Sequence, residues 1–434
     1  MELTQNQIKL LSRWRISTFW VCLIGYIGYY ICRKNLSAAV PLLSEEFNYT
    51  NAELGLIALY SEMAYALGKF INGPLGDKVG GKKIFLAGML GAIICNFLFS
   101  FGSNLIYFIA VWCVCRYFLS MGWGGLAKMI GNWYEPEKNG TVMGFISLNF
   151  QFGGVIATLF AGMLVAAGMG WQAIFIYPPL VLIVIFLWSF FCSKDSPQDI
   201  IPNTTFGQSS EKYQSILDED ESNEDKNLTP IKKLLKLRLF KVLLVYSFLT
   251  TFLRSIFFFW TPKLLVDLGM GTSNAILKSA LFPLLGCAGT IFIGWYTDKH
   301  SKDNRAKMMW KMLLGLVICL LVMVTIILYS PQNQNLMVAV LALCGFFLLG
   351  PYSMSSGCLT LDIAGAKAAG SSTGLIDGLG YIGGALAVWS AGKLSDDLGW
   401  GQVFMLLSFF ATLATLCALF MSYEFNKRIK SHLK

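Results

Sequence analysis

Two adjacent cations, Arg33 and Lys34, stand inside an apolar stretch of the sequence that runs from about Ile16 to about Pro41. A stretch of this length and composition predicts a membrane-spanning helix. A cation well inside the bilayer costs about 2.5–3.5 kcal/mol on insertion scales, so its presence indicates a functional role. The alternative is that the long side chain of Arg33 snorkels to the lipid headgroups.

The helical period places hydroxyl groups beside this guanidinium. Tyr26, Tyr30 and Ser37 lie seven, three and four positions from Arg33, which puts all of them on one helical face. Lys34 is turned by about 100° from that face and could serve a different partner. A guanidinium with neighbouring hydroxyls offers several hydrogen-bond donors, so this face suits an anion with several oxygen atoms.

A second arginine repeats the pattern in a later apolar stretch. Arg254 lies 221 positions after Arg33, and the same interval separates Pro41 from Pro262 and Asp77 from Asp298. An interval of 230 relates two series of glycines, in which Gly140, Gly144, Gly153, Gly154 and Gly162 match Gly370, Gly374, Gly383, Gly384 and Gly392. The sequence therefore predicts a duplication of two halves in the same orientation, with a site at the midplane between them. Most of these glycines are expected to permit close helix packing.

Two arginines related by such a duplication would form a divalent clamp. Each guanidinium presents a rigid fork of donors that matches phosphate oxygens in pairs. A carboxylate needs one fork, whereas a phosphate can use two. We therefore expect a phosphate-type ligand at Arg33 and Arg254.

The composition is that of a polytopic helical membrane protein, because 55% of the 434 residues are hydrophobic and 14% are charged. The net charge of +9 sits mostly in short loops, so it does not indicate nucleic-acid binding. The 11 cysteines follow no zinc or disulfide spacing, and the two histidines, His300 and His432, lie near loop or tail charges. We expect no metal site, no cofactor and no enzymatic activity, since no nucleophile–base constellation appears.

Twelve apolar segments predict an all-α membrane protein with 12 transmembrane helices in two six-helix bundles. Their approximate bounds are 16–40, 53–75, 84–103, 105–130, 142–168, 173–192, 241–266, 275–297, 309–330, 337–361, 371–393 and 402–423. We expect residues 1–192 to form the N-terminal bundle, 193–240 a polar cytoplasmic linker and 241–434 the C-terminal bundle. Basic residues gather on one side of these segments, which predicts that both termini are cytoplasmic.

Further charged residues stand inside the predicted spans. Lys69 shares a helical face with Glu62 and Tyr65, and it either lines the substrate path or snorkels toward the cytoplasm. Glu62 could be the counter-ion of Lys69 or of Lys34, or a protonatable group. Arg116 stands in the fourth span.

Two more charged features each allow two interpretations. In the eleventh span Asp377 stands one turn before Tyr381, where it either pairs with a pathway cation or accepts a ligand hydroxyl. The charged loop Gly73–Lys83 predicts either a cytoplasmic latch or simple topology-setting charge. In the latch, Asp77 lies near a helix end, and lysines that include Lys82 point to neighbouring carboxylates.

These motifs resemble the organophosphate:phosphate antiporter family of the major facilitator superfamily. The pattern Gly-Tyr-x-x-Tyr-Tyr-x-x-Arg-Lys-Asn at Gly25–Asn35 is similar to that of the family's bacterial glycerol-3-phosphate transporters. The resemblance continues through Tyr65–Phe70, Met121–Trp123, Arg254, Trp260–Pro262 and Ala369–Gly384, and it covers the chain except the linker. It implies that Arg33 and Arg254 bind phosphate, and that the site or pathway is lined by Lys69, Tyr26, Tyr30, Tyr65 and Tyr381.

Two residues depart from the family pattern. Phe150 stands in the fifth span, where the family's glycerol-phosphate and hexose-phosphate transporters carry a histidine. Asp377 stands where the glycerol-phosphate transporters are uncharged. Both departures leave the organic part of the substrate open.

The leading hypothesis is a secondary active transporter that exchanges a small organophosphate, such as a sugar phosphate or glycerol 3-phosphate, for inorganic phosphate by alternating access. One alternative is a sugar-phosphate membrane sensor of the same fold that signals through a partner kinase. Another is a proton-coupled organic-anion transporter that titrates Glu62 or Asp377. We expect a monomer in a bacterial inner membrane, whose partners are membrane lipid, a phosphate ester and inorganic phosphate.

Overall fold

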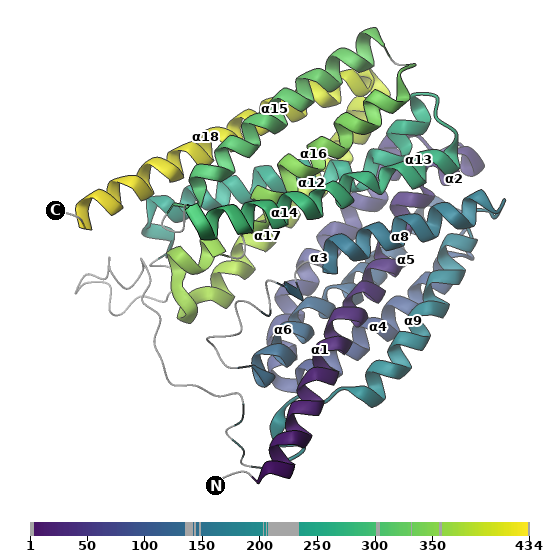
Figure 1. Cartoon of the computed structure of the whole chain (residues 1–434). Helices are drawn as coiled ribbons and strands as arrows, with labels where there is room; N and C mark the ends of the chain where they lie inside the picture. The colour runs from purple at the N-terminus through teal and green to yellow at the C-terminus, as the bar shows by residue number, and fades with distance from the viewer. Residues whose placement is uncertain are drawn as a thin grey trace. The chain divides into compact units, whose positions relative to one another are not determined.

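The computed structural model describes residues 4–134, 142, 145–146, 149–202, 204, 206, 234–300, 304–330, 332–355 and 358–432. These residues form helices and no β-strand (Figure 1). Ten helical segments among them are long and apolar enough to cross a membrane. The other two predicted spans, 142–168 and 371–393, overlap helices α8 and α17, described below. The predicted all-α membrane fold is therefore confirmed.

Some predicted features lie outside the described residues. They are residues 203, 205 and 207–233 of the linker, Gly140, Gly144, and the side chains of Asp77, Asp298 and His432.

Contacts divide the chain into two compact units. The first unit takes in the described residues of Met1–Asn48 and Tyr60–Glu211. Its helices are α1 (Gln5–Arg33), α2 (Asn35–Phe47), most of α3 (Asn51–Val79), α4 (Gly81–Phe99), α5 (Leu105–Leu119), α6 (Met121–Trp133), α8 (Asn149–Ala166) and α9 (Ala173–Cys192), with a 3₁₀ turn at Pro197–Asp199. Helix α1 packs against α8 and α9, and α4 packs against α5, α6 and α9.

The second unit takes in Tyr49–Leu59 and the described residues of Lys212–Lys434. Its helices are the start of α3, α12 (Arg238–Asp267), α13 (Thr272–Ser279), α14 (Leu281–His300), α15 (Ala306–Tyr329), α16 (Gln334–Ser355), α17 (Cys358–Leu398) and α18 (Trp400–His432). Helix α12 packs along α17, α14 along α16 and α15 along α18. The predicted domain boundaries around 193–240 stay a prediction.

Glycines bring one helix pair into close contact in each unit. A Cβ atom added at Gly153 of α8 would lie 2.7 Å from Cβ of Tyr30 and 3.4 Å from Cα of Ile27 in α1. A Cβ atom added at Gly383 of α17 would lie 2.8 Å from the ring of Phe248 in α12. Gly383 follows Gly153 by 230 positions and Phe248 follows Ile27 by 221, the two intervals of the sequence repeat. The packing role expected for these glycines is thus confirmed.

Three predicted spans are interrupted, which differs from the continuous helices that the sequence predicted. The interruptions lie at Lys34, Ser120 and Ala280. At the second of them, the Ser120 hydroxyl donates to the carbonyl of Tyr117 at 2.7 Å and accepts from Nδ2 of Asn72 at 2.8 Å. A hydroxyl that bonds back to the preceding turn competes with the helical backbone pattern and bends the helix.

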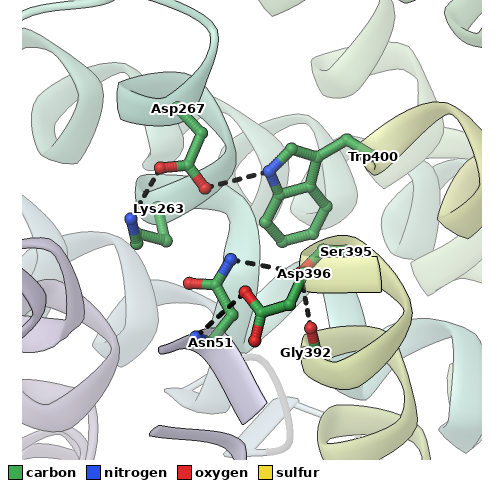
Figure 2. A network of polar contacts seen from close by, with 7 residues as sticks. All are labelled: Asn51, Lys263, Asp267, Gly392, Ser395, Asp396 and Trp400. Atoms are coloured by element: carbon green, nitrogen blue, oxygen red, sulfur yellow. Dashed lines mark hydrogen bonds and ion pairs between the residues drawn. The ribbon is translucent and has the colours of Figure 1, made fainter. Parts of the chain in front are cut away.

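The start of α3 is capped by a residue of α17 (Figure 2). The carboxylate of Asp396 accepts from the backbone N–H groups of Asn51 at 3.2 Å and Ala52 at 2.7 Å. Nδ2 of Asn51 also donates to Oγ of Ser395 at 3.1 Å. The first N–H groups of a helix have no partner within the helix, and its N-terminus favours negative charge, so this carboxylate serves both needs.

The end of α12 is tied to the start of α18 in the same region (Figure 2). Nζ of Lys263 lies 2.6 Å from Oδ1 of Asp267, one turn further along α12. Oδ2 of the same carboxylate accepts from the indole N–H of Trp400 at 3.0 Å. Asp267 therefore uses both of its oxygens to fix the junction of the two helices.

The start of α4 is tied to the end of α9. Nζ of Lys82 donates to the carbonyl oxygens of Phe190 at 2.7 Å and Ser193 at 2.6 Å, which complements the C-terminal end of that helix. Asp195 accepts instead from the backbone N–H of Lys82 at 2.7 Å. The ammonium thus binds carbonyl oxygens, whereas the sequence prediction directed it to a carboxylate. The latch role itself stays a prediction.

Candidate substrate-binding site

Arg33 is the last residue of α1, and its half-buried guanidinium is held by two tyrosines. Nη1 donates a hydrogen bond to the hydroxyl oxygen of Tyr65 at 3.2 Å. The guanidinium carbon lies 4.5 Å from the centroid of the Tyr65 ring and 5.3 Å from that of Tyr30. Both separations are within the range of cation–π attraction.

Tyr65 is the centre of a cluster of positive charge in the first unit. Its side chain is fully buried, and three cations lie around its ring. The guanidinium carbons of Arg33 and Arg116 are each 4.5 Å from the centroid, and Nζ of Lys69 is 5.5 Å from it. The structure therefore brings together Arg33, Lys69 and Tyr65, which the sequence predicted as site residues, and adds Arg116 from α5.

Glu62 forms a salt bridge with Arg116 at the edge of this cluster. Arg116 was not among the partners that the sequence suggested for Glu62, and the pairing of Glu62 with Lys69 or Lys34, like its alternative role as a protonatable group, stays a prediction. Arg33 and Arg116 lie within about 9 Å of each other, since each is 4.5 Å from the same ring. At an effective dielectric constant of about 20, two such charges repel by about 2 kcal/mol. A carboxylate beside one of them offsets that repulsion.

An aromatic group continues the face of α1 away from Arg33. Tyr26 and Tyr30 are both buried, and their rings meet edge to face at 5.5 Å. The ring of Trp123 in α6 lies 5.5 Å from Tyr26. Tyr26, Tyr30 and Arg33 thus form a continuous face of α1, as the sequence predicted, and Trp123 of α6 packs against this face.

The interruption after Arg33 is bracketed by a buried amide network. Asn96 of α4 accepts from Nδ2 of Asn35 at 2.6 Å and donates to the carbonyl of Cys32 at 3.3 Å. It also donates to the carbonyl of Ala92 at 2.8 Å, which holds its own orientation. One amide therefore contacts the chain on both sides of Arg33 and the half-buried Lys34, so it fixes the backbone from which both cations extend.

Arg254 lies in α12 of the second unit, and 8% of its surface is exposed. Its guanidinium carbon is 4.8 Å from the ring of Phe258 and 4.7 Å from the ring of Tyr352 in α16. Like Arg33, it is a guanidinium held against aromatic rings inside an apolar span. Tyr352 was not among the predicted site residues.

The remaining predicted site residues lie on α17 and α8. Asp377 and Tyr381 are half-buried and stand one turn apart on α17, which packs along the helix that carries Arg254. Phe150 is half-buried in the first turn of α8, one turn before Gly153. Their roles in substrate binding stay predictions.

The arrangement in the first unit has the chemistry of an anion site. Three cations lie around the buried ring of Tyr65, beside further aromatic side chains, and this low-polarity setting strengthens their electrostatic attraction for an anion. Among the described residues, no group of three or more histidine, cysteine, aspartate or glutamate side chains could hold a metal ion.

The family model of the Major Facilitator Superfamily matches residues 22–388. The chain belongs to the major facilitator superfamily. In agreement, it superimposes with a TM-score of 0.76 on the inward-facing, unoccupied structure of a bacterial homolog of the human lysosomal transporter Spinster. That match covers 95% of this chain and 98% of the other at 15% identity, so it supports the fold alone.

Three relatives narrow the resemblance within this superfamily. A probable hexose phosphate transport protein of Chlamydia pneumoniae is 27% identical over 98% of this chain and 95% of its own length. The glycerol-3-phosphate transporter of Bacillus subtilis is 28% identical over 91% of this chain and 89% of its own length. The membrane sensor protein UhpC of Escherichia coli is 25% identical over 94% of this chain and 92% of its own length. The predicted resemblance to the organophosphate:phosphate antiporter family is therefore confirmed.

Proposed function

We propose that this chain is a secondary active transporter that exchanges a small organophosphate, a sugar phosphate or glycerol 3-phosphate, for inorganic phosphate by alternating access. Arg33 and Arg254 bind the phosphate group. Lys34, Lys69 and Tyr65 add charge and hydrogen bonds. Tyr26, Tyr30, Phe150, Asp377 and Tyr381 line the site or the pathway and contact the organic part of the ligand.

The observation that carries this proposal is the cluster around Tyr65. Three cations lie within 5.5 Å of the centroid of one buried ring in an apolar helical unit. Ionisable residues inside membrane spans are rare and mark substrate paths, and a cluster of positive charge suits an anionic ligand. The relatives named as hexose phosphate and glycerol-3-phosphate transporters supply the ligand class. The repeat relates Arg33 to Arg254, which supports the same role for the second arginine.

The exchange mechanism follows from the charge of the site. In an empty site several cations stand close together in a medium of low dielectric constant, and their mutual repulsion opposes closure of the transporter around it. A phosphate group carries about −1.5 to −2 charges near pH 7 and neutralises them. Only the loaded transporter then changes its orientation readily, so each outward passage of one phosphate compound requires the inward passage of another.

The test is exchange in liposomes loaded with inorganic phosphate. We expect the wild-type protein to take up radiolabelled phosphate, and Arg33→Ala or Arg254→Ala to abolish that uptake. Arg13→Ala is the matched control, because Arg13 is exposed and lies in the same helix as Arg33. Uptake by either of the first two variants at the wild-type rate contradicts the assignment. Competition by a panel of sugar phosphates and glycerol 3-phosphate then identifies the organic substrate.

A second candidate function is a membrane sensor for a sugar phosphate that signals through a partner kinase. The similarity to the sensor protein UhpC and the departures at Phe150 and Asp377 favour it. A sensor binds the ligand in detergent but exchanges it slowly or not at all in liposomes. The proton-coupled alternative, with Glu62 or Asp377 as the titrating group, requires uptake that a pH gradient drives without internal phosphate.

The chain is an integral multi-pass membrane protein of the major facilitator superfamily. We further propose that it resides in a bacterial inner membrane with both termini in the cytoplasm. Two bacterial transporters among its relatives and the basic residues near the predicted cytoplasmic ends support this placement. The monomeric state and the lipid contacts stay predictions.

A further inference from the structure

We propose that each unit contains a two-thiol site that binds one soft, two-coordinate metal ion such as Hg²⁺. The first site is formed by Cys95 of α4 and Cys115 of α5, and the second by Cys319 of α15 and Cys344 of α16. This inference goes beyond the proposed function, since neither pair belongs to the residues that we assign to the phosphate compound.

The two thiols of each pair face each other across neighbouring helices. The Cys95 side chain hydrogen-bonds that of Cys115. The Cys319 side chain makes the same kind of bond with that of Cys344. Three of the four side chains are buried, and that of Cys319 is half-buried. Two ligand atoms are therefore already close together in each unit. Because each pair joins two different helices, the spacing of cysteines in the sequence does not reveal it.

The sequence repeat extends to both pairs. Cys319 follows Cys95 by 224 positions, and Cys344 follows Cys115 by 229. Two unrelated contacts between cysteines would not be expected to recur at equivalent positions of the two halves. Four neighbouring residues match at the same two intervals, namely Gly91 with Gly315, Ile94 with Ile318, Phe118 with Phe347, and Leu119 with Leu348. Each pair therefore belongs to a duplicated contact between two helices.

A glycine brings the two helices of each pair close together. A Cβ atom added at Gly91 would overlap the ring of Phe118, and one added at Gly315 would lie 2.8 Å from the ring of Phe347. Each glycine lies about one turn before the first cysteine of its pair, and each phenylalanine about one turn after the second. The glycine contact thus lies next to the thiol contact and sets the separation of the helices there.

Two thiols in an apolar region suit a soft divalent ion. Among the described residues, neither pair is joined by a third side chain of the kinds that hold metal ions. Structural Zn²⁺ takes four ligands, whereas soft thiolates prefer soft ions, of which Hg²⁺ forms linear complexes with two of them. One divalent ion and two thiolates carry no net charge together, so an apolar interior can accommodate the complex. A monovalent ion would leave one negative charge there.

Binding exchanges two protons for one metal ion. With mercuric chloride, both thiols lose their protons, two sulfur–mercury bonds form and two chloride ions leave, so atoms and charges balance. Mercuric chloride is uncharged and can therefore enter an apolar region. The half-buried Cys319 is flanked by the exposed side chains of Ile318 and Leu321. The second site should therefore fill faster than the first.

Metal at the first site should also inhibit phosphate exchange, and this part of the inference rests on the proposed function. Cys115 directly precedes Arg116, whose guanidinium carbon lies 4.5 Å from the centroid of the Tyr65 ring. A linear sulfur–mercury–sulfur bridge holds two sulfur atoms farther apart than a hydrogen bond does, so α5 must shift relative to α4. That shift displaces a cation of the cluster around Tyr65.

The experiment measures how much mercury the purified protein retains in detergent after treatment with mercuric chloride and then with excess N-acetylcysteine, a competitor with one thiol. Native mass spectrometry counts the metal ions on each chain. A pair of thiols retains the ion better than a single cysteine does, because its second bond forms within the molecule. We expect two mercury ions on each wild-type chain, and no zinc ion when zinc chloride replaces mercuric chloride.

Variants assign each ion to one pair. Cys95→Ala and Cys319→Ala should each retain one mercury ion, and the double variant none. Cys417→Ala is the matched control, since Cys417 is a half-buried cysteine of α18 outside both pairs, and it should retain two. Cys115→Ala and Cys344→Ala remove the other thiol of each pair and should have the same effect, so each site can be tested even where one variant does not fold.

The outcomes are distinct. Two mercury ions on the double variant, a loss of mercury in the control, or retention of zinc overturns the two-thiol sites. In liposomes, mercuric chloride should inhibit exchange by the wild-type protein at roughly tenfold lower concentration than exchange by Cys95→Ala. Equal inhibition of both overturns the effect of the first site on the substrate site. A wild-type protein that retains two mercury ions but exchanges no phosphate supports the sites and overturns the proposed function.

Discussion

Arg33 donates a hydrogen bond from Nη1 to the hydroxyl oxygen of Tyr65 at 3.2 Å, and this bond joins the end of α1 to the middle of α3. A guanidinium has five donors in a planar fork, so fixing one of them fixes the direction of the rest. The tyrosine thus orients the cation that we assign to the phosphate group, and it does so from a fully buried position.

Removing the Tyr65 hydroxyl should weaken phosphate binding but not abolish it. Tyr65→Phe keeps the ring beneath the guanidinium but loses the acceptor for Arg33, and a hydrogen bond to a charged group contributes about 1.5 kcal/mol or more. We expect KM for inorganic phosphate to rise roughly tenfold in the liposome exchange assay. The control is Tyr60→Phe, an exposed tyrosine of the same helix. Unchanged KM in Tyr65→Phe would contradict the orienting role.

Lysine should not replace arginine at position 33. An ammonium keeps the positive charge but has no planar fork for paired phosphate oxygens and for the Tyr65 hydroxyl at once. We expect Arg33→Lys to retain some binding of phosphate in detergent and to lose at least tenfold in kcat/KM for exchange. The control is Arg13→Lys in the same helix. Wild-type exchange in Arg33→Lys would show that charge alone is sufficient.

Asn96 should influence the site although we assign it no contact with the substrate. Its replacement by leucine removes the hydrogen-bond partner of the buried Asn35 amide and of the Cys32 carbonyl. The loss of a buried hydrogen bond destabilises the fold by about 1–3 kcal/mol for each group. We expect Asn96→Leu to raise KM for phosphate and to lower thermal stability. Asn96→Asp keeps the acceptor oxygen toward Asn35 and should lie between leucine and wild type. Equal KM in all three proteins would restrict Asn96 to a role in stability.

The candidate site shows how far sequence reasoning reaches here. Arg33, Lys69 and Tyr65 could be predicted because each breaks an apolar pattern or shares a helical face with another polar residue. The salt bridge of Glu62 with Arg116 could not, since it depends on how α3 packs against α5. A helical period relates residues of one helix, and it carries no information on which helices are neighbours.

The fold, too, could be predicted from the sequence only where it does not depend on contacts between helices. Apolar length predicted the spans, and the repeat intervals predicted two equivalent halves. The interruptions at Lys34 and Ser120 were missed because the apolar pattern continues on both sides of each residue. The Ser120 hydroxyl that bonds back to Tyr117 also accepts from Asn72, a residue of another helix, and local propensity does not reveal that tertiary contact. The cap that Asp396 provides for α3 is likewise a tertiary contact.

The close contact between α1 and α8 should not tolerate a methyl group. Gly153→Ala places Cβ 2.7 Å from Cβ of Tyr30, and such overpacking costs about 1–3 kcal/mol. This exceeds the gain of about 0.5–1 kcal/mol that alanine brings to a helix. We expect a lower midpoint of thermal unfolding in detergent. Gly131→Ala is the control, since its added Cβ would meet no atom within 4 Å beyond the neighbouring residues and backbone of its own helix, and it should be neutral or stabilising.

The start of α3 should open more readily when its cap from α17 is removed. Thr50 and Glu53 bond each other across the first turn, so the Glu53 N–H is satisfied locally, and Asp396 serves the N–H groups of Asn51 and Ala52. Asp396→Ala removes the carboxylate that accepts from those two donors, and the loss of such a cap destabilises a helix by about 1 kcal/mol. Hydrogen–deuterium exchange at Asn51 and Ala52 should then become about fivefold faster.

Two further variants separate the cap from a general loss of negative charge at the end of α17. Asp396→Asn keeps an acceptor oxygen but loses the favourable interaction of a charge with the helix dipole, so we expect an exchange rate between those of wild type and Asp396→Ala. Asp397→Ala removes an exposed neighbouring carboxylate and should leave exchange at Asn51 and Ala52 unchanged. Equal acceleration in Asp396→Ala and Asp397→Ala would mean that net charge, rather than the two hydrogen bonds, stabilises the first turn of α3.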